Sequence, residues 1–224
     1  MDIFLDMTGT ITDMESENYA FLKMSEAIGK RFSIDISSEE IMRHILNYRK
    51  PYMEKRHIEY YPIRNLIVRA IEQLLPRKLS SKEALWIMNT YAEFHAKYVK
   101  LAPEAMNALK KMRSICSHMG LITDADTPYT MKVLSALKIE SFFDSVVTAE
   151  DAGVGKPNPK IFRIALQKSS EKIKIYIGDS EQRDIVGAKR MGMIVIKIGE
   201  TSNLADYVAF NLKEAAEIIE NLIQ

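Results

Sequence analysis

The sequence has very little cysteine, since Cys116 is the single one among 224 residues. One thiol excludes an internal disulfide and a cysteine-rich zinc site. It is compatible with a reducing compartment but does not require one. A lone thiol is also a candidate nucleophile. We instead expect Cys116 to be a small buried hydrophobic residue ahead of a strand.

Long hydrophobic runs are missing as well. No uninterrupted apolar run reaches the roughly 18 residues that a membrane-spanning helix needs. Residues 1–6 contain no basic residue, and acidic residues flank their short apolar stretch, unlike a secretory signal. The sequence therefore predicts a cytoplasmic protein with no membrane partner.

The chain also lacks an excess of charge of one sign. Its 31 lysines and arginines nearly balance 30 aspartates and glutamates, for a net charge of +1. This balance argues against a nucleic-acid-binding protein that relies on its overall field. A hydrophobic content of 47% is typical of a packed globular protein. The length fits one large domain, or a core with a modest insert.

Strand and helix patterns alternate in the second half of the chain. Helical spacing separates short apolar runs that predict strands at residues 119–123, 145–148, 173–177, 193–196 and 207–208. A further short run at residues 3–5 predicts the first strand. Alternation of this kind predicts an α/β fold, a doubly wound parallel sheet with helices on both faces.

The region after the first strand shows helical patterns only. Serines followed by glutamates at Ser37 and Ser80 predict two helix starts, and Pro51 is expected to end one helix. The sequence thus predicts an all-helical insert in the sheet domain. We assign residues 1–13 and 100–224 to the α/β core and residues 14–99 to the insert.

Polar residues follow the predicted strands where these strands end. Asp6 follows the first strand, and Thr123 and Asp124 follow the strand at 119–123. Lys156 lies in a glycine-rich loop, and Asp179 follows the strand at 173–177, with Asp184 five residues later. Because ligands bind beyond the carboxyl ends of strands in an open parallel sheet, we expect these side chains to converge.

The set has a consistent chemistry. Asp6 and Asp179 together offer the oxygen ligands that Mg²⁺ prefers. Lys156 supplies positive charge, and the Thr123 hydroxyl can bond an anion. These features are typical of a phosphoryl-transfer site, in which Asp6 would attack phosphorus and form an aspartyl-phosphate.

Each of these residues also has a purely structural interpretation. An aspartate such as Asp6 commonly forms a turn, and Thr123 or Asp124 could cap the following helix. Asp184 could be an exposed acid in the first turn of a helix. Their shared position at strand ends, in this order, favours the functional interpretation.

With these motifs, the sequence resembles the haloacid dehalogenase-like hydrolase superfamily. Residues 6–10 (Asp-Met-Thr-Gly-Thr) are similar to the first motif, Asp-x-Asp-Gly-Thr, and Thr123 to the second. Lys156 before proline is similar to the third motif, and Gly-Asp-Ser at 178–180 with Asp184 to the fourth. The resemblance covers essentially the whole chain, and it implies that residues 14–99 form the helical cap of that family.

The resemblance also implies roles for the nucleophile and the metal ligands. Asp6 would be the nucleophile and a Mg²⁺ ligand. The backbone carbonyl of Thr8 and the carboxylate of Asp179 would be further ligands, and Asp184 would hold the metal or its waters. The residues expected at the substrate are Thr8, Thr123, Asp124 and Lys156.

Thr8 departs from the family pattern. The phosphatases of this family carry their general acid and base, an aspartate, at this position, and threonine does not titrate near neutral pH. Three possibilities follow: the leaving group needs little protonation or another side chain protonates it, the phosphoenzyme is long-lived, or Thr8 is an engineered change. The candidate proton donors are Asp13, Glu15, Glu17 and His44.

The sequence leaves two other features open. A basic run could attract an anionic substrate or form a solvated face, and it comprises Arg43, Arg49, Lys50, Lys55 and Arg56. Four tyrosines could line the inner surface of the cap or only pack it, namely Tyr48, Tyr52, Tyr60 and Tyr61.

The predicted function is a Mg²⁺-dependent hydrolase of small phosphorylated metabolites. The alternatives are a dehalogenase or phosphonate hydrolase using the same Asp6, or a phosphate-binding scaffold with low turnover. A homodimer through the surface of the cap is possible in each case.

Overall fold

The computed structural model describes residues 1–223, and a six-stranded parallel sheet lies at its centre. The strand order is β3-β2-β1-β4-β5-β6. This order confirms the predicted doubly wound α/β fold. The strands are β1 (Asp2–Leu5), β2 (His118–Thr123), β3 (Ser145–Thr148), β4 (Lys174–Gly178), β5 (Ile194–Ile198) and β6 (Tyr207–Ala209).

Alternating side chains on each strand divide the apolar core into two layers. On β1, Ile3 and Leu5 belong to one cluster of buried residues, and Phe4 belongs to the other. Successive side chains of a strand point to opposite faces, so the two clusters lie on the two faces of the sheet. Burial on both faces explains why these strands are near-continuous apolar runs in the sequence.

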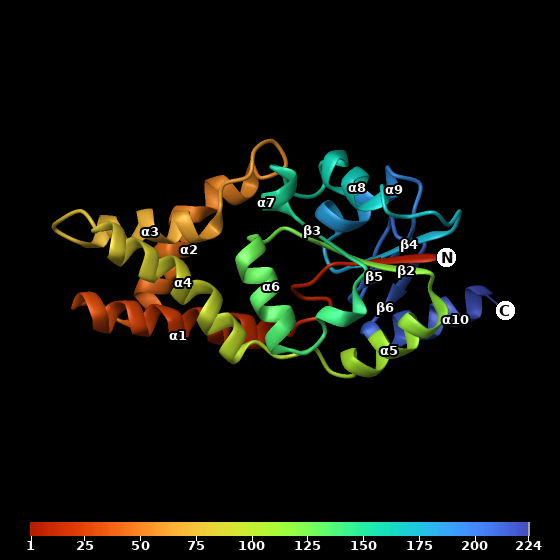
Figure 1. Cartoon of the computed structure of the whole chain (residues 1–224), viewed down its shortest axis with the longest axis horizontal. Helices are drawn as coiled ribbons and strands as arrows, with labels where there is room; N and C mark the ends of the chain where they lie inside the picture. The colour runs from red at the N-terminus through yellow and green to blue at the C-terminus, as the bar shows by residue number, and fades with distance from the viewer. Residues whose placement is uncertain (224) are drawn as a thin grey trace.

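Helices cover both faces of the sheet (Figure 1). The layer that contains Ile3 includes α5 (Ala105–Ile115), α6 (Thr127–Ala136) and α10 (Leu212–Ile223). The layer that contains Phe4 includes α7 (Ala149–Ala152), α8 (Pro159–Leu166) and α9 (Val186–Lys189). Short helical turns at Glu140–Phe142 and Glu181–Ile185 complete the connections.

Four helices between β1 and α5 form a segment that extends away from the sheet (Figure 1). They are α1 (Met14–Phe32), α2 (Ser38–Glu54), α3 (Ile63–Leu74) and α4 (Ser81–Tyr98). We call residues 14–98 the helical segment. Its action as a cap stays a prediction. Ser37 and Ser80 cap α2 and α4 as expected, each in a reciprocal pair with a glutamate three residues later.

Two local expectations were wrong. Pro51 does not end its helix, because α2 continues to Glu54 with Pro51 exposed in its last turn. A proline there removes only one intrahelical hydrogen bond near the end of the helix, so the helix tolerates it. Cys116 precedes β2 as expected and packs against the core, but it is half-buried rather than buried.

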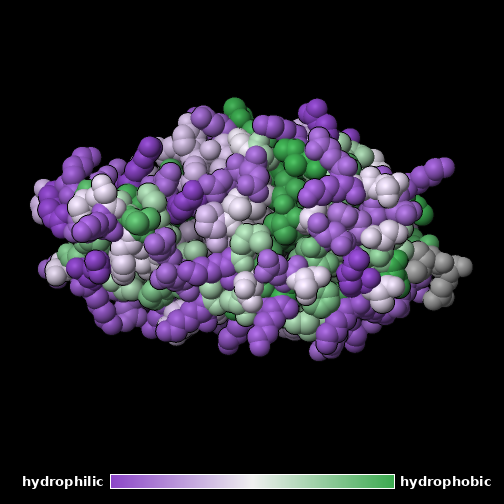
Figure 2. All heavy atoms as spheres, viewed as in Figure 1, coloured by the Kyte–Doolittle hydropathy of each residue, from purple (hydrophilic) through white to green (hydrophobic). Residues whose placement is uncertain are grey.

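The molecular surface agrees with this layering. Hydrophilic residues cover most of the face in view, and hydrophobic residues form a band near the middle with smaller patches toward both ends (Figure 2). Within residues 1–223, no helix combines the length and the apolar character that a membrane crossing requires.

Asp126 links the helical segment to the sheet domain. It lies fully buried at the start of α6 and accepts hydrogen bonds from the Tyr60 hydroxyl at 2.5 Å and from the backbone N–H groups of Ile63 and Arg64 at 2.7 and 2.9 Å. These are the first amides of α3, which has no side-chain cap from its own N-terminal residue. A carboxylate of the core therefore caps a helix of the segment.

We predict that Asp126→Ala lowers the free energy of unfolding by roughly 2–4 kcal/mol, because two buried donors and one partly buried donor lose their acceptor. Urea unfolding followed by circular dichroism measures this change. The control is the exposed Asp35→Ala, for which we expect a change within about 0.5 kcal/mol. Equal effects of the two substitutions would contradict the linking role of Asp126.

Candidate functional site

The site lies where the strand order reverses direction. Strands β1 and β4 are neighbours in register, with Leu5 opposite Ile177, and the Asp6 N–H donates to the Ile177 carbonyl at 2.9 Å. Asp6 and Asp179 therefore leave the same edge of the sheet. In a doubly wound sheet this switch point is the usual position of the ligand.

Three carboxylates meet at this edge. Asp6, Asp179 and Asp184 each offer an oxygen, and these oxygens all lie within 4.8 Å of one another. Asp184 is fully buried, which rules out its interpretation as an exposed acid. One Asp184 oxygen accepts the Ser180 N–H at 3.0 Å, and the other accepts the Tyr176 hydroxyl at 2.7 Å.

Lys156 inserts between two of these carboxylates. Its side chain is 1% exposed, and its Nζ lies 2.6 Å from Asp6 Oδ1 and 2.5 Å from Asp184 Oδ1. The Lys156 backbone N–H donates to Asp124 Oδ1 at 2.7 Å, which fixes the loop between α7 and α8. The predicted convergence of these loops is thus present.

One ammonium does not balance three carboxylates, and the pKa values reflect this. The pKa of Asp6 is raised to about 7, because burial and the neighbouring carboxylates of Asp184 and Asp179 together outweigh the opposing effect of Lys156. Burial also raises the pKa of Asp179. Burial acts in the same direction on Asp184, but Lys156 outweighs it and holds the pKa of this carboxyl below its usual range.

These residues fit a divalent cation with oxygen ligands. Asp179 Oδ1 is buried and has no hydrogen-bond partner among the described residues. Gly9 approaches Asp179 so closely that a Cβ at Gly9 would lie 2.7 Å from Asp179 Oδ2, and its φ of +82° suits glycine. The loop carrying Thr8 therefore runs beside the carboxylates. An all-oxygen set with an unsatisfied carboxylate is the environment that Mg²⁺ prefers.

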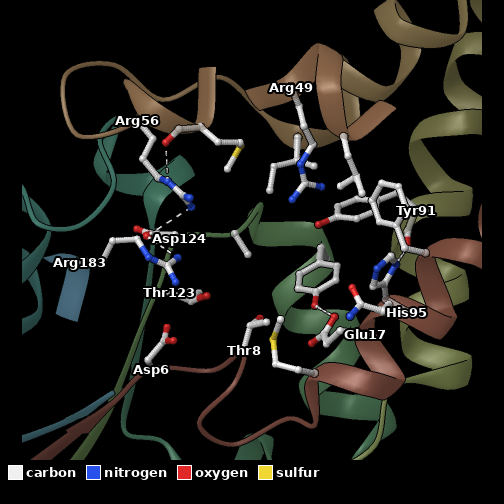
Figure 3. A pocket seen from close by; sticks show the side chains of 18 of the residues that line it. Asp6, Thr8, Glu17, Arg49, Arg56, Tyr91, His95, Thr123, Asp124 and Arg183 are labelled. Atoms are coloured by element: carbon white, nitrogen blue, oxygen red, sulfur yellow. Dashed lines mark hydrogen bonds and ion pairs between the residues drawn. The ribbon is translucent and has the colours of Figure 1, made fainter. Parts of the chain in front are cut away.

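A cavity of about 260 Å³ opens above Asp6 (Figure 3). From the core, it is lined by Asp6, Thr8, Thr123, Asp124 and Asp179. From the helical segment, its polar lining includes Glu17, Arg49, Arg56 and His95. Of the site residues predicted from the sequence, Lys156 and Asp184 alone do not line this cavity. Lys156 contacts Asp6 directly, and the same ammonium contacts Asp184.

Thr123 and Asp124 do not cap the next helix. The residue at the start of α6 is Asp126, so both side chains are available to the cavity. Asp124 Oδ2 lies 3.4 Å from an Arg56 nitrogen and 3.6 Å from an Arg183 nitrogen. Asp124 thus pairs with two guanidinium groups, of which that of Arg183 also interacts with the charge of Asp6.

Two residues of the site, Arg183 and Tyr176, are not predicted from the sequence. Arg183 lies between the two aspartates of the fourth motif, where its charge was the only signal. Burial tends to lower the pKa of Arg183, but the carboxylates of Asp6 and Asp124 raise it. Tyr176 belongs to a strand, and no local pattern shows that its hydroxyl reaches Lys156 and Asp184.

The basic run and the tyrosines divide by position. In the basic run, Arg49 and Arg56 line the cavity, whereas Arg43, Lys50 and Lys55 are exposed. The tyrosines pack rather than line the cavity, since Tyr48, Tyr52 and Tyr61 contact one another and Tyr60 bonds to Asp126.

Of the four candidate proton donors, Glu17 alone lines the cavity. Asp13 accepts the Ser16 N–H and caps α1, Glu15 is exposed, and His44 Nε2 lies 3.0 Å from the Ala70 carbonyl oxygen.

Glu17 lies beside Thr8 (Figure 3). It is buried and accepts the hydroxyls of Thr12 and Tyr129 at 2.8 and 2.7 Å. Burial raises the pKa of its carboxyl.

Without metal, we predict that Asp6→Asn stabilises the protein at pH 8. The folded state keeps the Asp6 proton up to about pH 7, whereas the unfolded state loses it near pH 3.8, so stability falls between these pH values. Asparagine does not ionise, so the variant keeps this stability. The difference amounts to roughly 4 kcal/mol, at about 1.36 kcal/mol per unit of pKa shift. Urea unfolding in chelator at pH 4 and pH 8 measures it. If Asp6→Asn is instead less stable than wild type at pH 8, the attraction of Lys156 for the Asp6 carboxylate outweighs the cost of burying it.

Comparisons with known proteins point to one family. The family model described as haloacid dehalogenase-like hydrolase matches residues 3–198. A glyceraldehyde 3-phosphate phosphatase of Methanocaldococcus jannaschii is 31% identical over 59% of this chain and 62% of its own length, which is less than two thirds of that relative. A protein of the same name from Pyrococcus furiosus is 27% identical over 97% of this chain and 92% of its own length.

A solved structure has the same fold. The HAD-hydrolase YfnB of Bacillus subtilis, described with bound magnesium, superposes with a TM-score of 0.79 at 15% identity, over 98% of each chain. The family model covers most of the chain. The chain therefore belongs to the haloacid dehalogenase-like hydrolases, a family of enzymes.

Proposed function

We propose that this hydrolase is a Mg²⁺-dependent phosphatase of small phosphorylated metabolites, with Asp6 as its nucleophile. The observation that carries the proposal is the buried arrangement of Asp6, Lys156 and Asp184 beneath a cavity lined by Thr123 and Asp179. The names of the two relatives support a phosphate monoester as the substrate class.

In this proposal Asp6 attacks the phosphorus atom with one carboxylate oxygen. The bond between phosphorus and the leaving oxygen breaks as an Asp6 Oδ–phosphorus bond forms. Water then attacks phosphorus, which releases inorganic phosphate and restores the carboxylate. Lys156, hydrogen-bonded to Asp6 Oδ1, opposes the effect of burial on the pKa of Asp6 and fixes the orientation of its carboxylate.

Other residues would act on the phosphoryl group. The Thr123 hydroxyl would donate to a phosphoryl oxygen, and Arg183 would add positive charge beside it. Asp6, Asp179 and the Thr8 carbonyl would hold Mg²⁺, with Asp184 supporting them. The cation would neutralise charge on the phosphoryl oxygens. We further propose that the helical segment acts as a cap that excludes water from the cavity.

The leaving group needs a proton source different from Thr8, because threonine cannot supply it. Glu17 is the best-placed of the candidate donors, through its position beside Thr8. An acidic leaving group, which needs no proton, and a long-lived phosphoenzyme are also consistent with attack by Asp6. An engineered origin of Thr8 is compatible with each of these mechanisms. A homodimer and a cytoplasmic location also stay predictions.

We predict that the wild-type protein hydrolyses p-nitrophenyl phosphate with Mg²⁺ and that excess EDTA abolishes this activity. Asp6→Asn should lower turnover by at least about 10⁴-fold. Phosphate release and near-UV circular dichroism measure activity and fold. Retained turnover in Asp6→Asn would refute the nucleophile. Halide release that ignores EDTA would indicate a dehalogenase, carbon–phosphorus cleavage a phosphonate hydrolase, and no turnover on any substrate a scaffold.

A second prediction concerns the missing general acid. Thr8→Asp should raise turnover of an alkyl phosphate by about 10²-fold or more, since it supplies a positioned proton. It should change p-nitrophenyl phosphate turnover much less, because nitrophenolate leaves without a proton. The comparison is kcat for glycerol 3-phosphate and for p-nitrophenyl phosphate in both proteins. If alkyl phosphate turnover falls instead, Thr8 belongs to a different mechanism.

A further inference from the structure

Arg49 is a cation at the helical-segment side of the cavity without a carboxylate partner among residues 1–223. It points from α2 into the cavity (Figure 3), and its guanidinium lies 5.4 Å from the centre of the Phe21 ring. Arg56 and Arg183, by contrast, share the Asp124 carboxylate. A half-buried cation that no carboxylate balances favours an anion from outside.

His95 lies close to Arg49 and presents a fixed hydrogen-bond acceptor. Its side chain is 3% exposed and packs between the rings of Phe21, Tyr91 and Tyr129. Its Nδ1 lies 2.7 Å from the Tyr91 carbonyl oxygen. A carbonyl only accepts, so Nδ1 carries the hydrogen.

The other ring nitrogen of His95 is therefore free to accept. Burial, aided by Arg49, lowers the pKa of His95 to about 4, so the ring is neutral near pH 7 and Nε2 holds a lone pair. Nε2 has no hydrogen-bond partner within the described residues 1–223, although His95 lines the cavity. An acceptor of this kind suits a hydroxyl of a bound molecule.

We propose that Arg49 and His95 form a substrate subsite that selects phosphate monoesters of hydroxycarboxylic acids, with the carboxylate on Arg49 and a hydroxyl on His95 Nε2. This inference rests on the proposed function. One planar guanidinium matches one carboxylate, whereas a second phosphate dianion would require more cations than this end of the cavity holds. The cavity of about 260 Å³ suits a small substrate.

Four monoesters of one chain length test the subsite. 3-Phosphoglycerate has both groups, and 3-phosphonooxypropanoate lacks the hydroxyl. 2-Hydroxypropyl phosphate lacks the carboxylate, and propyl phosphate lacks both groups. The four-carbon homologues form a parallel set. In at least one set we expect the hydroxy acid to have a kcat/KM at least about 10-fold above that of the ester with neither group.

Substitutions then assign the groups. Arg49→Gln should lower the preference for esters with a carboxylate by about 10- to 100-fold, the range of a charged hydrogen bond. His95→Phe should lower the preference for esters with a hydroxyl by about 2- to 10-fold. If the phenylalanine variant does not fold, His95→Asn, which keeps an acceptor, is measured in its place. Arg43→Gln, on the exposed face of the same helix, should leave all values unchanged.

The outcomes separate the two proposals. The subsite is refuted, while the phosphatase stands, if the four esters within each set react equally well with wild type. It is also refuted if Arg49→Gln lowers kcat/KM equally for all esters. If no ester releases phosphate with Mg²⁺, the proposed function fails. The subsite is then judged by binding alone, since 3-phosphoglycerate should raise the melting temperature of wild type more than that of Arg49→Gln, and an equal or absent shift would overturn it.

Discussion

The buried ammonium of Lys156 is the interaction on which the site depends. Removing an ammonium from water costs several kcal/mol unless close partners replace the water. Here Asp6 and Asp184 lie within 2.6 Å of it, and Tyr176 and the Ile122 carbonyl complete its hydrogen bonds. These partners come from the ends of β1, β2 and β4 and from the segment after β4. One side chain therefore holds four parts of the fold in a fixed relation.

The same cluster carries more negative charge than Lys156 balances. Asp179 keeps a buried oxygen without a partner among the described residues. Burial and the acidic neighbours of Asp6 raise the pKa of Asp6, so this carboxyl is hard to ionise. In the absence of a cation, this arrangement lowers the stability of the fold. The loss is the expected cost of a site built to bind a divalent ion and then a phosphoryl group.

The sequence predicts the sheet well because parallel strands buried on both faces are apolar runs, and their ends are marked by Asp6, Thr123 and Asp179. It fails where long-range packing decides. Pro51 was expected to end its helix, but α2 continues to Glu54 because Pro51 lies exposed in its last turn. The burial of Asp184 and the link from Tyr60 to Asp126, 66 residues apart, leave no local pattern. The roles of the site residues and the cap stay predictions, because shared position does not establish chemistry.

The most direct test of the central claim is a search for phosphate on Asp6. Protein turning over a substrate with Mg²⁺ is quenched in acid, digested with trypsin and analysed by mass spectrometry. We expect the peptide covering residues 1–23 to gain one phosphoryl group. The group should map to Asp6, and alkali or hydroxylamine should remove it. A phosphoryl group on another residue, or phosphate release by Asp6→Asn at the wild-type rate, would contradict the central claim.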